Sequence, residues 1–424
     1  MKLAPDPLTR RRFVEWFARG VLGVKLGGAA AHAAAPAARR ACADHVIYLF
    51  LRGGLSHVDT FDPKPGREEM AGVGAIGTSA DGVQVSEWFP RLARHMHRVA
   101  LVRSMTSTQG VHERGNYLAH TAFFQTPTIT HPALGAWALR LLGPSAGGLP
   151  GNILINGSPQ HPGAGFLGPD LAPLPVIDPS AGLPDSRPAA GATTEDVARR
   201  SALADDLGAG FLGRVARRDP AAYRELRDKA RALMRSDDLK AFDLSAEDPR
   251  LRREYGDTPF GQGCLLARRL VEHGVRFIEV EDSQNWDTHN DHVPSMRRMT
   301  PALDQALAAL LGDLANRGLL ERTLVVMATE FGRSPRISEV TAGRGHHPAA
   351  FTWWLAGGGV KGGFVHGATD EAGERVAEAP VSMPDFNATI AHALGLPLAA
   401  EVRSPSGRPF TVAGDGRPVL PLFA

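Results

Sequence analysis

One stretch in the second half of the chain limits the possible folds more than any other. Residues 275–280 (VRFIEV) form a short apolar run, residues 301–317 have the 3.6-residue periodicity of an amphipathic helix, and residues 323–329 (TLVVMAT) form a second apolar run. A strand, a helix and a strand in this order are typical of a β-α-β unit, whose strands lie parallel in one sheet. Gly318 directly follows the helical pattern, where glycine commonly ends a helix.

Further elements of the same kind occur on both sides of this unit. Apolar runs at residues 44–51, 98–103, 152–155 and 351–356 predict strands, and residues 385–393 predict a helix that Asp385 caps and Gly395 ends. Strands that alternate with helices favour an α/β fold. We therefore expect three layers, α/β/α, with helices on both faces of a mostly parallel central sheet.

A charged segment near residues 195–275 has helical composition and interrupts this alternation. Within it, one helical face is apolar and consists of Tyr223, Leu226, Ala230 and Leu233. No fixed-period repeat is present. We expect a single domain over residues 39–424 that contains this helical segment.

Composition excludes some classes of partner. The 424 residues are 43% hydrophobic, which is enough for a large core, and the formal net charge is only +2. Such a balanced chain does not predict a nucleic-acid partner. The cysteines Cys42 and Cys264 are too few for a disulfide framework.

The amino terminus resembles a twin-arginine export signal. Residues 9–14 (TRRRFV) precede a weakly apolar stretch, and small-residue cleavage sites follow it near residues 31–35. The apolar stretch contains Glu15, Arg19 and Lys25, and each such charge costs roughly 2.5–3.5 kcal/mol at a bilayer centre, so a permanent membrane span is not expected. We predict that residues 1–38 are the signal, that the twin-arginine translocation machinery exports the chain, and that it works in the periplasm or outside the cell. The alternative is an amphipathic first helix.

The chemistry is expected where the strands end. In open α/β sheets, ligands bind outside the carboxyl ends of the strands, because the loops there converge. The polar residues that follow the predicted strands are Arg52, Ser56, His57, Asp59 and Asp62 after the first, Thr106, Ser107, Thr108 and His112 after the second, Asp287, His289, Asp291 and His292 after the third, and Glu330 and Arg333 after the fourth, with His346 and His347 before the last.

These residue types suit a divalent metal. Carboxylates and neutral imidazoles are the usual oxygen and nitrogen ligands of zinc, and the mixture favours a transition metal. The predicted metal ligands are Asp287, His289, His292, Glu330, His346 and His347. The alternative is that these side chains only cap helices and satisfy loop backbones.

Two other groups of residues allow two interpretations each. Arg333 could bind a phosphate or sulfate through bidentate hydrogen bonds, or it could pair with Glu330. Trp286, Trp353 and Trp354 could line a sugar pocket, or they could be aromatic residues of the core.

Three groups of motifs resemble one bacterial family. They are residues 51–64 (LRGGLSHVDTFDPK), residues 286–289 (WDTH), and residues 329–333 (TEFGR) together with 345–348 (GHHP) and 355–363 (LAGGGVKGG). The chain is similar along nearly its whole mature length to the family called domain of unknown function 1501, in which twin-arginine signals are common. This resemblance implies the fold of the alkaline phosphatase and sulfatase superfamily, whose members use a metal-supported Ser, Thr or formylglycine nucleophile.

The resemblance also implies roles for single residues. Thr108 lies four residues before His112, as the nucleophile of the superfamily usually does, and Ser107 is the fallback. Gly53 or Gly54 stands where the superfamily has a metal-binding Asp. Glu330-Phe331 stands where it has an Asp-His pair. Of the two metal sites of the superfamily, one is therefore expected to keep its ligands and the other to have lost some of them. Arg52 or Arg333 is expected to supply the positive charge that the second metal ion would have provided.

Together these features predict an exported, metal-dependent hydrolase of phosphate or sulfate esters, whose substrate is a small molecule or a glycan. The alternative is a non-catalytic periplasmic or surface protein that binds a sugar or an anionic polymer in the same cleft. A third interpretation is an exported assembly partner with a vestigial site.

Overall fold

A nine-stranded sheet forms the centre of the protein. The computed structural model describes residues 41–424, apart from residues 146–147 and most of the stretch 184–235. The strand order is β12-β4-β11-β8-β1-β7-β5-β6, and β15 also pairs with β4. The strands are β1 (His45–Leu51), β4 (Val99–Thr106), β5 (Asn152–Ile155), β6 (Leu174–Val176), β7 (Phe277–Asp282), β8 (Thr323–Ala328), β11 (Phe351–Ala356), β12 (Phe364–His366) and β15 (Val381–Ser382).

The sheet is mostly parallel, as predicted. Strand β1 lies between β7 and β8 and is parallel to both, with Leu49 opposite Val280 on one side and Met327 on the other. Strand β11 is the exception, because it runs antiparallel to β4 and to β8. The carboxyl ends of β1, β7 and β8 therefore lie next to one another at one edge of the sheet.

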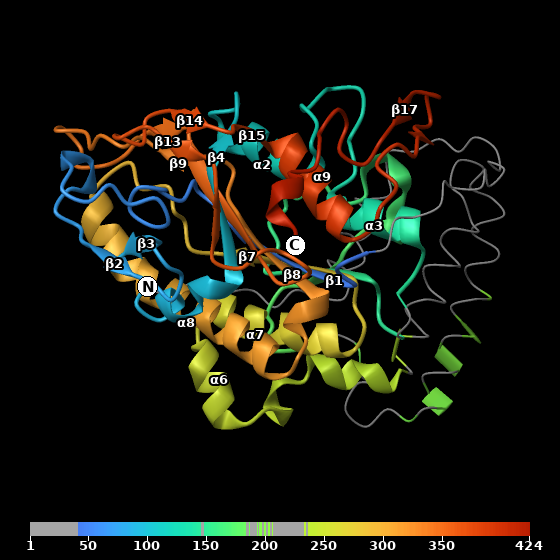
Figure 1. Cartoon of the computed structure of the whole chain (residues 1–424). Helices are drawn as coiled ribbons and strands as arrows, with labels where there is room; N and C mark the ends of the chain where they lie inside the picture. The colour runs from blue at the N-terminus through green and yellow to red at the C-terminus, as the bar shows by residue number, and fades with distance from the viewer. Residues whose placement is uncertain are drawn as a thin grey trace.

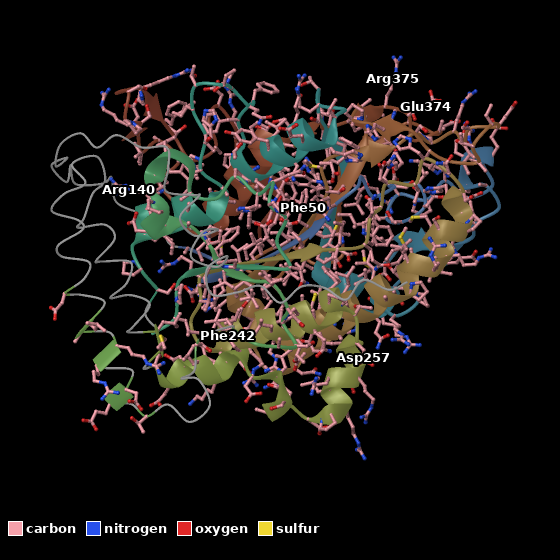
Figure 2. All side chains as sticks on the ribbon, turned by 180° about the vertical axis from the view of Figure 1, so that it is seen from behind. Phe50, Arg140, Phe242, Asp257, Glu374 and Arg375 are labelled. Atoms are coloured by element: carbon pink, nitrogen blue, oxygen red, sulfur yellow. The ribbon has the colours of Figure 1, made fainter. Side chains whose placement is uncertain are left out.

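Helices cover both faces of the sheet and complete the three predicted layers. Figure 1 shows α2 (His112–Thr121), α3 (Leu134–Leu142) and α9 (Met383–Ala393) on one side, and α6 (Pro249–Tyr255), α7 (Pro259–Glu272) and α8 (His292–Asn316) on the other. Successive side chains of a strand point to opposite faces. In β1, Tyr48 and Phe50 therefore belong to one apolar core, and Ile47 and Leu49 belong to the other. Figure 2 shows Phe50 in the middle of the molecule, between the two helical layers.

Within the described residues, four two-stranded sheets lie outside the central sheet. They pair β2 (Ala75–Gly77) with β3 (Gln84–Ser86), β9 (Gly332–Arg333) with β10 (His346–His347), β13 (Ala368–Thr369) with β14 (Val376–Glu378), and β16 (Val402–Arg403) with β17 (Pro409–Phe410). The pair β9 and β10 matters most here, because it carries residues of the candidate site.

The strands β1, β8 and β11 lie within one residue of their predicted bounds, whereas β4 ends three residues later than predicted and β7 lies two residues further along the chain. Two helix starts also differ. Helix α8 begins at His292 rather than at residue 301, so that Pro301 lies inside it. Ser382, not Asp385, is the N-cap of α9. The Ser382 side chain accepts a hydrogen bond from the Asp385 backbone N–H, while the Asp385 carboxylate accepts one from the Ser382 backbone N–H. Gly318 and Gly395 both adopt a φ of +70°, the left-handed conformation expected just after a helix.

Several predictions concern residues that the structure does not describe. The export signal at residues 1–38 and most of the apolar face around Tyr223 lie outside the described part of the chain. In the described part, no helix is both long and apolar enough to span a membrane. Trp286, Trp353 and Trp354 are at most 1% exposed, so they belong to the core rather than to a sugar pocket.

Candidate metal centre

Four side chains from three separate parts of the chain converge at the carboxyl ends of the central strands. His112 is the first residue of α2, Asp287 and His289 lie in the loop after β7, and His346 lies on β10. The Nε2 atoms of His289 and His346 are 2.9 Å apart. The Asp287 Oδ1 atom lies 3.1 Å from His289 Nε2, 3.3 Å from His112 Nε2 and 3.5 Å from His346 Nε2.

These separations fit a set of metal ligands. Ligand atoms about 2.0–2.2 Å from a tetrahedral zinc ion lie roughly 3.3–3.6 Å from one another. The ligand atoms of His112, Asp287 and His346 all lie within 4.8 Å of one another. Two imidazoles and one carboxylate match the donor types that a divalent transition metal prefers. His289 lies beside this group, with its Nε2 2.9 Å from His346 Nε2 and 3.4 Å from Arg333 Nη1.

Glu330 holds His112 in the orientation that this site needs. The His112 Nδ1 atom is 2.6 Å from Glu330 Oε1, and the same oxygen accepts a hydrogen bond of 2.8 Å from the Gly53 backbone N–H. Because a carboxylate can only accept, His112 Nδ1 carries the proton and Nε2 presents its lone pair. His112 Nε2 is buried and has no hydrogen-bond partner. A carboxylate behind a ligating imidazole is the usual support of a metal-bound histidine.

A backbone carbonyl holds His346 in the same way. Its Nδ1 atom donates to the Gly110 carbonyl at 2.7 Å, which leaves the Nε2 lone pair directed at Asp287 and His289. Burial lowers the pKa of His346, although the bond to Gly110 opposes this. The neutral imidazole, which is the form that binds a metal, is therefore favoured.

The charge states of Asp287 and His112 follow from their neighbours. Burial by itself would raise the pKa of Asp287, but the hydrogen bond and positive charge of Arg333 outweigh it and lower that pKa. Burial opposes a charged His112, yet Glu330 and then Asp287 outweigh this and raise the His112 pKa. In the absence of metal, the carboxylate of Asp287 is therefore ionised. A metal ion that binds His112 has to compete with a proton for its imidazole.

Arg333 is fully buried and directed at protein atoms. Its Nε donates to the Gly54 carbonyl at 3.0 Å and its Nη1 to the Arg344 carbonyl at 3.1 Å, while Nη2 contacts the Gly53 carbonyl and Asp287 Oδ1. Each of its three nitrogens thus already has an acceptor. Arg333 is therefore better suited to hold Asp287 and the turn after β1 in place than to bind a substrate anion.

The resemblance implied an Asp at the place of Gly53 or Gly54, and the structure gives a reason for the glycine at residue 53. Its φ is +112°, and a Cβ at this position would lie 2.5 Å from the Trp286 backbone nitrogen and 2.6 Å from that of Asp287. Only glycine tolerates both the conformation and the close approach. The loop that carries Asp287 therefore occupies the space that a side chain at residue 53 would need.

The structure separates the two adjacent histidines of β10. His346 pairs with Arg333 of β9 and His347 pairs with Gly332, so their side chains point to opposite faces. The His347 Nε2 atom is 2.8 Å from the Glu374 carbonyl, and its ring stacks on His57. Figure 2 shows Glu374 at the margin of the molecule. His347 is therefore not brought together with the four converging side chains.

His292 and Glu330 also lie outside the converging set. Both nitrogens of His292 have partners, because Nε2 is 2.8 Å from Asp59 Oδ2 and Nδ1 is 2.7 Å from Thr288 Oγ1. Arg344 pairs with the same Asp59, so this is a buried ionic network beneath the loop 287–289. Glu330 contacts His112 rather than the centre of the site. Of the six predicted ligands, Asp287, His289 and His346 converge, and Glu330 stands behind His112.

Thr108, the predicted nucleophile, and Arg52, the other arginine predicted to compensate charge, lie near the carboxyl ends of the central strands. Thr108 is exposed in the loop between β4 and α2, and its Oγ1 accepts a hydrogen bond of 3.3 Å from the Gln109 side chain. Ser107 Oγ accepts from the Gln109 backbone at 3.0 Å. Arg52 follows β1, and its side chain is 36% exposed with Nη1 4.0 Å from Glu281 Oε2.

Sequence reasoning did not include His112 among the ligands. His112 was expected only as one of the polar residues after the second predicted strand and, through the family resemblance, as the histidine four residues after Thr108. The available signal was that His112 opens a helix shortly after the strand β4, so that its side chain lies at the same edge of the sheet as the strand ends.

These features define the class of the protein: an α/β protein with a candidate metal centre at the carboxyl ends of its central strands. The chain belongs to the family described as "Protein of unknown function (DUF1501)", whose model matches residues 43–423. This match confirms the family expected from the sequence motifs. The comparison with curated proteins found no match.

Three solved structures illustrate the distant similarities in fold. The PsFucS1 sulfatase from Pseudoalteromonas sp. is 14% identical, with 84% of this chain and 68% of that chain covered and a TM-score of 0.40. The lipoteichoic acid synthase LtaP from Listeria monocytogenes is 9% identical, with 83% and 72% covered and a TM-score of 0.38. The phosphonate monoester hydrolase SpPMH from Silicibacter pomeroyi is 13% identical, with 90% and 76% covered and a TM-score of 0.37.

Proposed function

We propose that the protein is an exported, metal-dependent hydrolase of phosphate or sulfate esters, and that its substrate is a small ester or an ester carried by a glycan. The observation that carries the metal part is that the ligand atoms of His112, Asp287 and His346 lie within 4.8 Å of one another, and that His112 Nε2 is buried there without a hydrogen-bond partner. His289 lies beside this group. The ester class rests on the resemblance of the sequence motifs to the alkaline phosphatase and sulfatase superfamily.

His112, Asp287, His289 and His346 would hold the ion. A bound zinc ion would supply Lewis-acid polarisation of an ester oxygen. Among the protein's own groups, Thr108 offers an exposed hydroxyl as the nucleophile, and Arg52 offers a partly exposed guanidinium for the substrate anion. Arg333 would keep Asp287 in place, because its nitrogens are already bonded to the turn after β1 and to Asp287.

One observation favours the alternative of a non-catalytic binding protein. The Thr108 hydroxyl contacts the Gln109 side chain rather than an imidazole or a carboxylate that could take its proton. A site with a metal and an exposed cation but without an activated hydroxyl could bind an anionic glycan and leave it intact.

The adjacent histidines of β10 provide a matched test. The chain is purified, its metal content is measured by elemental analysis, and hydrolysis of aryl phosphates and aryl sulfates is assayed. His346→Ala should lose at least tenfold in metal affinity and lose turnover, whereas His347→Ala, one residue away, should keep its metal. Equal metal content in wild type and His346→Ala would refute the proposed centre. Metal binding without turnover, together with retention on a glycan array, would favour the binding protein.

Export is tested separately. The proposed signal at residues 1–38 depends on the arginines of residues 9–14. Replacement of Arg10, Arg11 and Arg12 by Lys should trap the precursor inside the cell, as fractionation and immunoblotting would detect. Unchanged export would argue for the amphipathic first helix instead.

A further inference from the structure

An open groove lies in the helical layer formed by α6, α7 and α8. It has a volume of about 300 Å³ and is lined by residues of η2 (Leu92–Arg98) with its N-cap Arg91, of α6 and of α8. Both η2 and α6 contact α8, so α8 forms the floor of the groove and the other two elements form its walls. Figure 1 shows α6 and α8 side by side in this layer. We refer to this feature as the α6–α8 groove.

The α6–α8 groove is separate from the candidate metal centre. The helix η2 leads into β4, which runs parallel to β8 because both are antiparallel to β11. The amino end of β4 therefore lies at the edge of the sheet opposite to the carboxyl ends that carry the candidate metal centre. Along α8, the lining residue Gln305 comes 13 residues after His292, which corresponds to about 20 Å. No residue that lines the groove has a part in the proposed hydrolysis.

The two walls of the groove are rich in arginine. Residues 91–98 (RLARHMHR) contain three arginines and no carboxylate, and residues 249–255 (PRLRREY) contain three arginines and one carboxylate, Glu254. On each wall, two of the three arginines are exposed. Because arginine stays protonated in proteins, the walls carry an excess of positive charge.

Two other carboxylates at the groove already have partners. Asp313 lines it, but its Oδ1 is 2.6 Å from Arg317 Nε and its Oδ2 is 2.8 Å from Arg268 Nε. Asp304 is buried, and its carboxylate accepts hydrogen bonds of 2.8 and 3.1 Å from two backbone N–H groups at the start of η2. Among the described residues, no carboxylate forms an ion pair with an arginine of either wall. The exposed arginines are therefore available to an anionic ligand.

Uncharged hydrogen-bonding groups complete the lining of the groove. They belong to His95, Gln305 and Asn316. The His95 Nδ1 atom is buried and has no hydrogen-bond partner. Burial lowers the pKa of His95, and positive neighbours on η2, led by Arg98, lower it further, so the ring is neutral at pH 7. Neutral donors and acceptors of this kind match the hydroxyl groups of a sugar, which both donate and accept.

The floor of the groove consists of small side chains. It includes Ala308, Ala309 and Gly312. A Cβ on Gly312 would lie 3.3 Å from His95 Cε1, so the η2 wall stands directly against the floor. Among the described residues, no Phe, Tyr or Trp lines the groove. Sites for single-stranded nucleic acids commonly stack the bases on such rings, so this lining suits a sugar chain better than a nucleic acid.

We propose that the α6–α8 groove binds a segment of a glycan strand that carries sulfate or phosphate groups. The exposed arginines of the walls pair with these groups, since a guanidinium binds such anions through paired N–H donors. His95, Glu254, Gln305 and Asn316 bind the hydroxyl groups. The volume of the groove is near the lower end of the range for small-ligand sites, which fits a short piece of a longer chain.

This site goes beyond the proposed hydrolysis and does not depend on it. A strand long enough to reach from the groove to the candidate metal centre stays attached while its esters reach that centre, because the second contact is then intramolecular. A short ester gains nothing from the groove. The experiment therefore measures binding of a polymer in the absence of metal.

The test measures binding of dextran sulfate to the purified full-length chain in EDTA, by calorimetry at several salt concentrations. Arg91→Gln/Arg94→Gln removes two wall charges, and Arg140→Gln/Arg375→Gln is the control that removes two exposed charges elsewhere. Figure 2 shows Arg140 and Arg375 far from Asp257, which follows α6. We expect the wall variant to bind about tenfold more weakly at low salt, and the slope of log affinity against log salt to fall by about one per arginine removed. The control should stay within about twofold of the wild type, as expected for charges outside the contact.

A further variant, Ala309→Phe, fills the floor of the groove and changes no charge. It should weaken binding as much as the wall variant does. Unsulfated dextran and a single-stranded oligothymidylate should bind more weakly than dextran sulfate. His346→Ala should bind dextran sulfate as the wild type does, so that failure of the candidate metal centre leaves this result unchanged.

Several results would overturn the proposal. They are no binding of dextran sulfate at low salt, equal losses in the two arginine pairs, unchanged binding by a folded Ala309→Phe, and binding of dextran or oligothymidylate as tight as that of dextran sulfate. If circular dichroism shows that Ala309→Phe does not fold, the two arginine pairs decide, because all four side chains are exposed.

Discussion

The substitution Glu330→Gln tests how the candidate metal centre is held together. Glu330 is fully buried, its Oε1 accepts from His112 Nδ1 at 2.6 Å and from the Gly53 backbone at 2.8 Å, and its Oε2 accepts from Thr329 Oγ1 at 3.2 Å. A glutamine of the same shape can keep its oxygen toward His112 and Gly53 and turn its amide toward Thr329 Oγ1, which can accept. The substitution therefore removes a charge and leaves the geometry in place.

The expected magnitude follows from that change of charge. A hydrogen bond to a charged group contributes about 1.5–3 kcal/mol, against about 0.5–1.5 kcal/mol for a neutral one, so His112 loses on the order of 1–1.5 kcal/mol of support. Each 1.4 kcal/mol corresponds to about tenfold in affinity. Loss of an outer carboxylate behind a ligating histidine typically weakens metal binding about 10- to 100-fold. We expect Glu330→Gln to weaken zinc binding about tenfold, at the lower end of this range.

The assay is competition with a calibrated zinc chelator at neutral pH, with Glu339→Gln as the control. Glu339 is exposed in the nearby loop, so its replacement makes the same change in charge without altering His112. The control should bind zinc within about twofold of the wild type. If Glu330→Gln also did so, Glu330 would not orient His112 and the interpretation of the site would be wrong.

Two further predictions address the ligand loop and the pH dependence of stability. Gly343→Ala should weaken zinc binding at least tenfold and lower the melting temperature, because its Cβ would lie 1.8 Å from the His289 carbonyl oxygen and such overpacking typically costs about 1–3 kcal/mol. Gly345→Ala, whose Cβ would meet nothing nearer than 3.9 Å, should match the wild type in the same assays, and equal effects of both would contradict this reasoning. Burial lowers the pKa of His57 from 6.5 to about 4, so the unfolded chain binds a proton that the folded chain does not as the pH falls through this window. Urea unfolding in EDTA should then show a loss of about 3 kcal/mol between pH 6.5 and 4 that His57→Gln lacks, and an identical pH profile for the variant would rule this out.

The sequence alone determined the framework of the protein. Continuous apolar runs fixed the strands β1, β8 and β11 to within one residue, because strands buried on both faces leave a pattern that needs no knowledge of their neighbours. The rule that ligands gather at the carboxyl ends of strands selected Asp287 and His289, and both lie beside His346, which was predicted from its place before the last strand. The motifs also predicted the family, which the match over residues 43–423 confirmed.

Only the tertiary structure decided how the candidate site is assembled. Nothing local distinguishes His346 from His347, because the choice depends on the pairing of β10 with β9, which turns one ring toward Asp287 and the other toward the Glu374 carbonyl. The place of His112 depends on α2 lying against the end of β8, where Glu330 reaches its ring. The contact between His112 and Glu330 joins residues 218 positions apart. A strand end predicts which side chains are near an edge of the sheet, but packing between distant segments determines which of their atoms face one another.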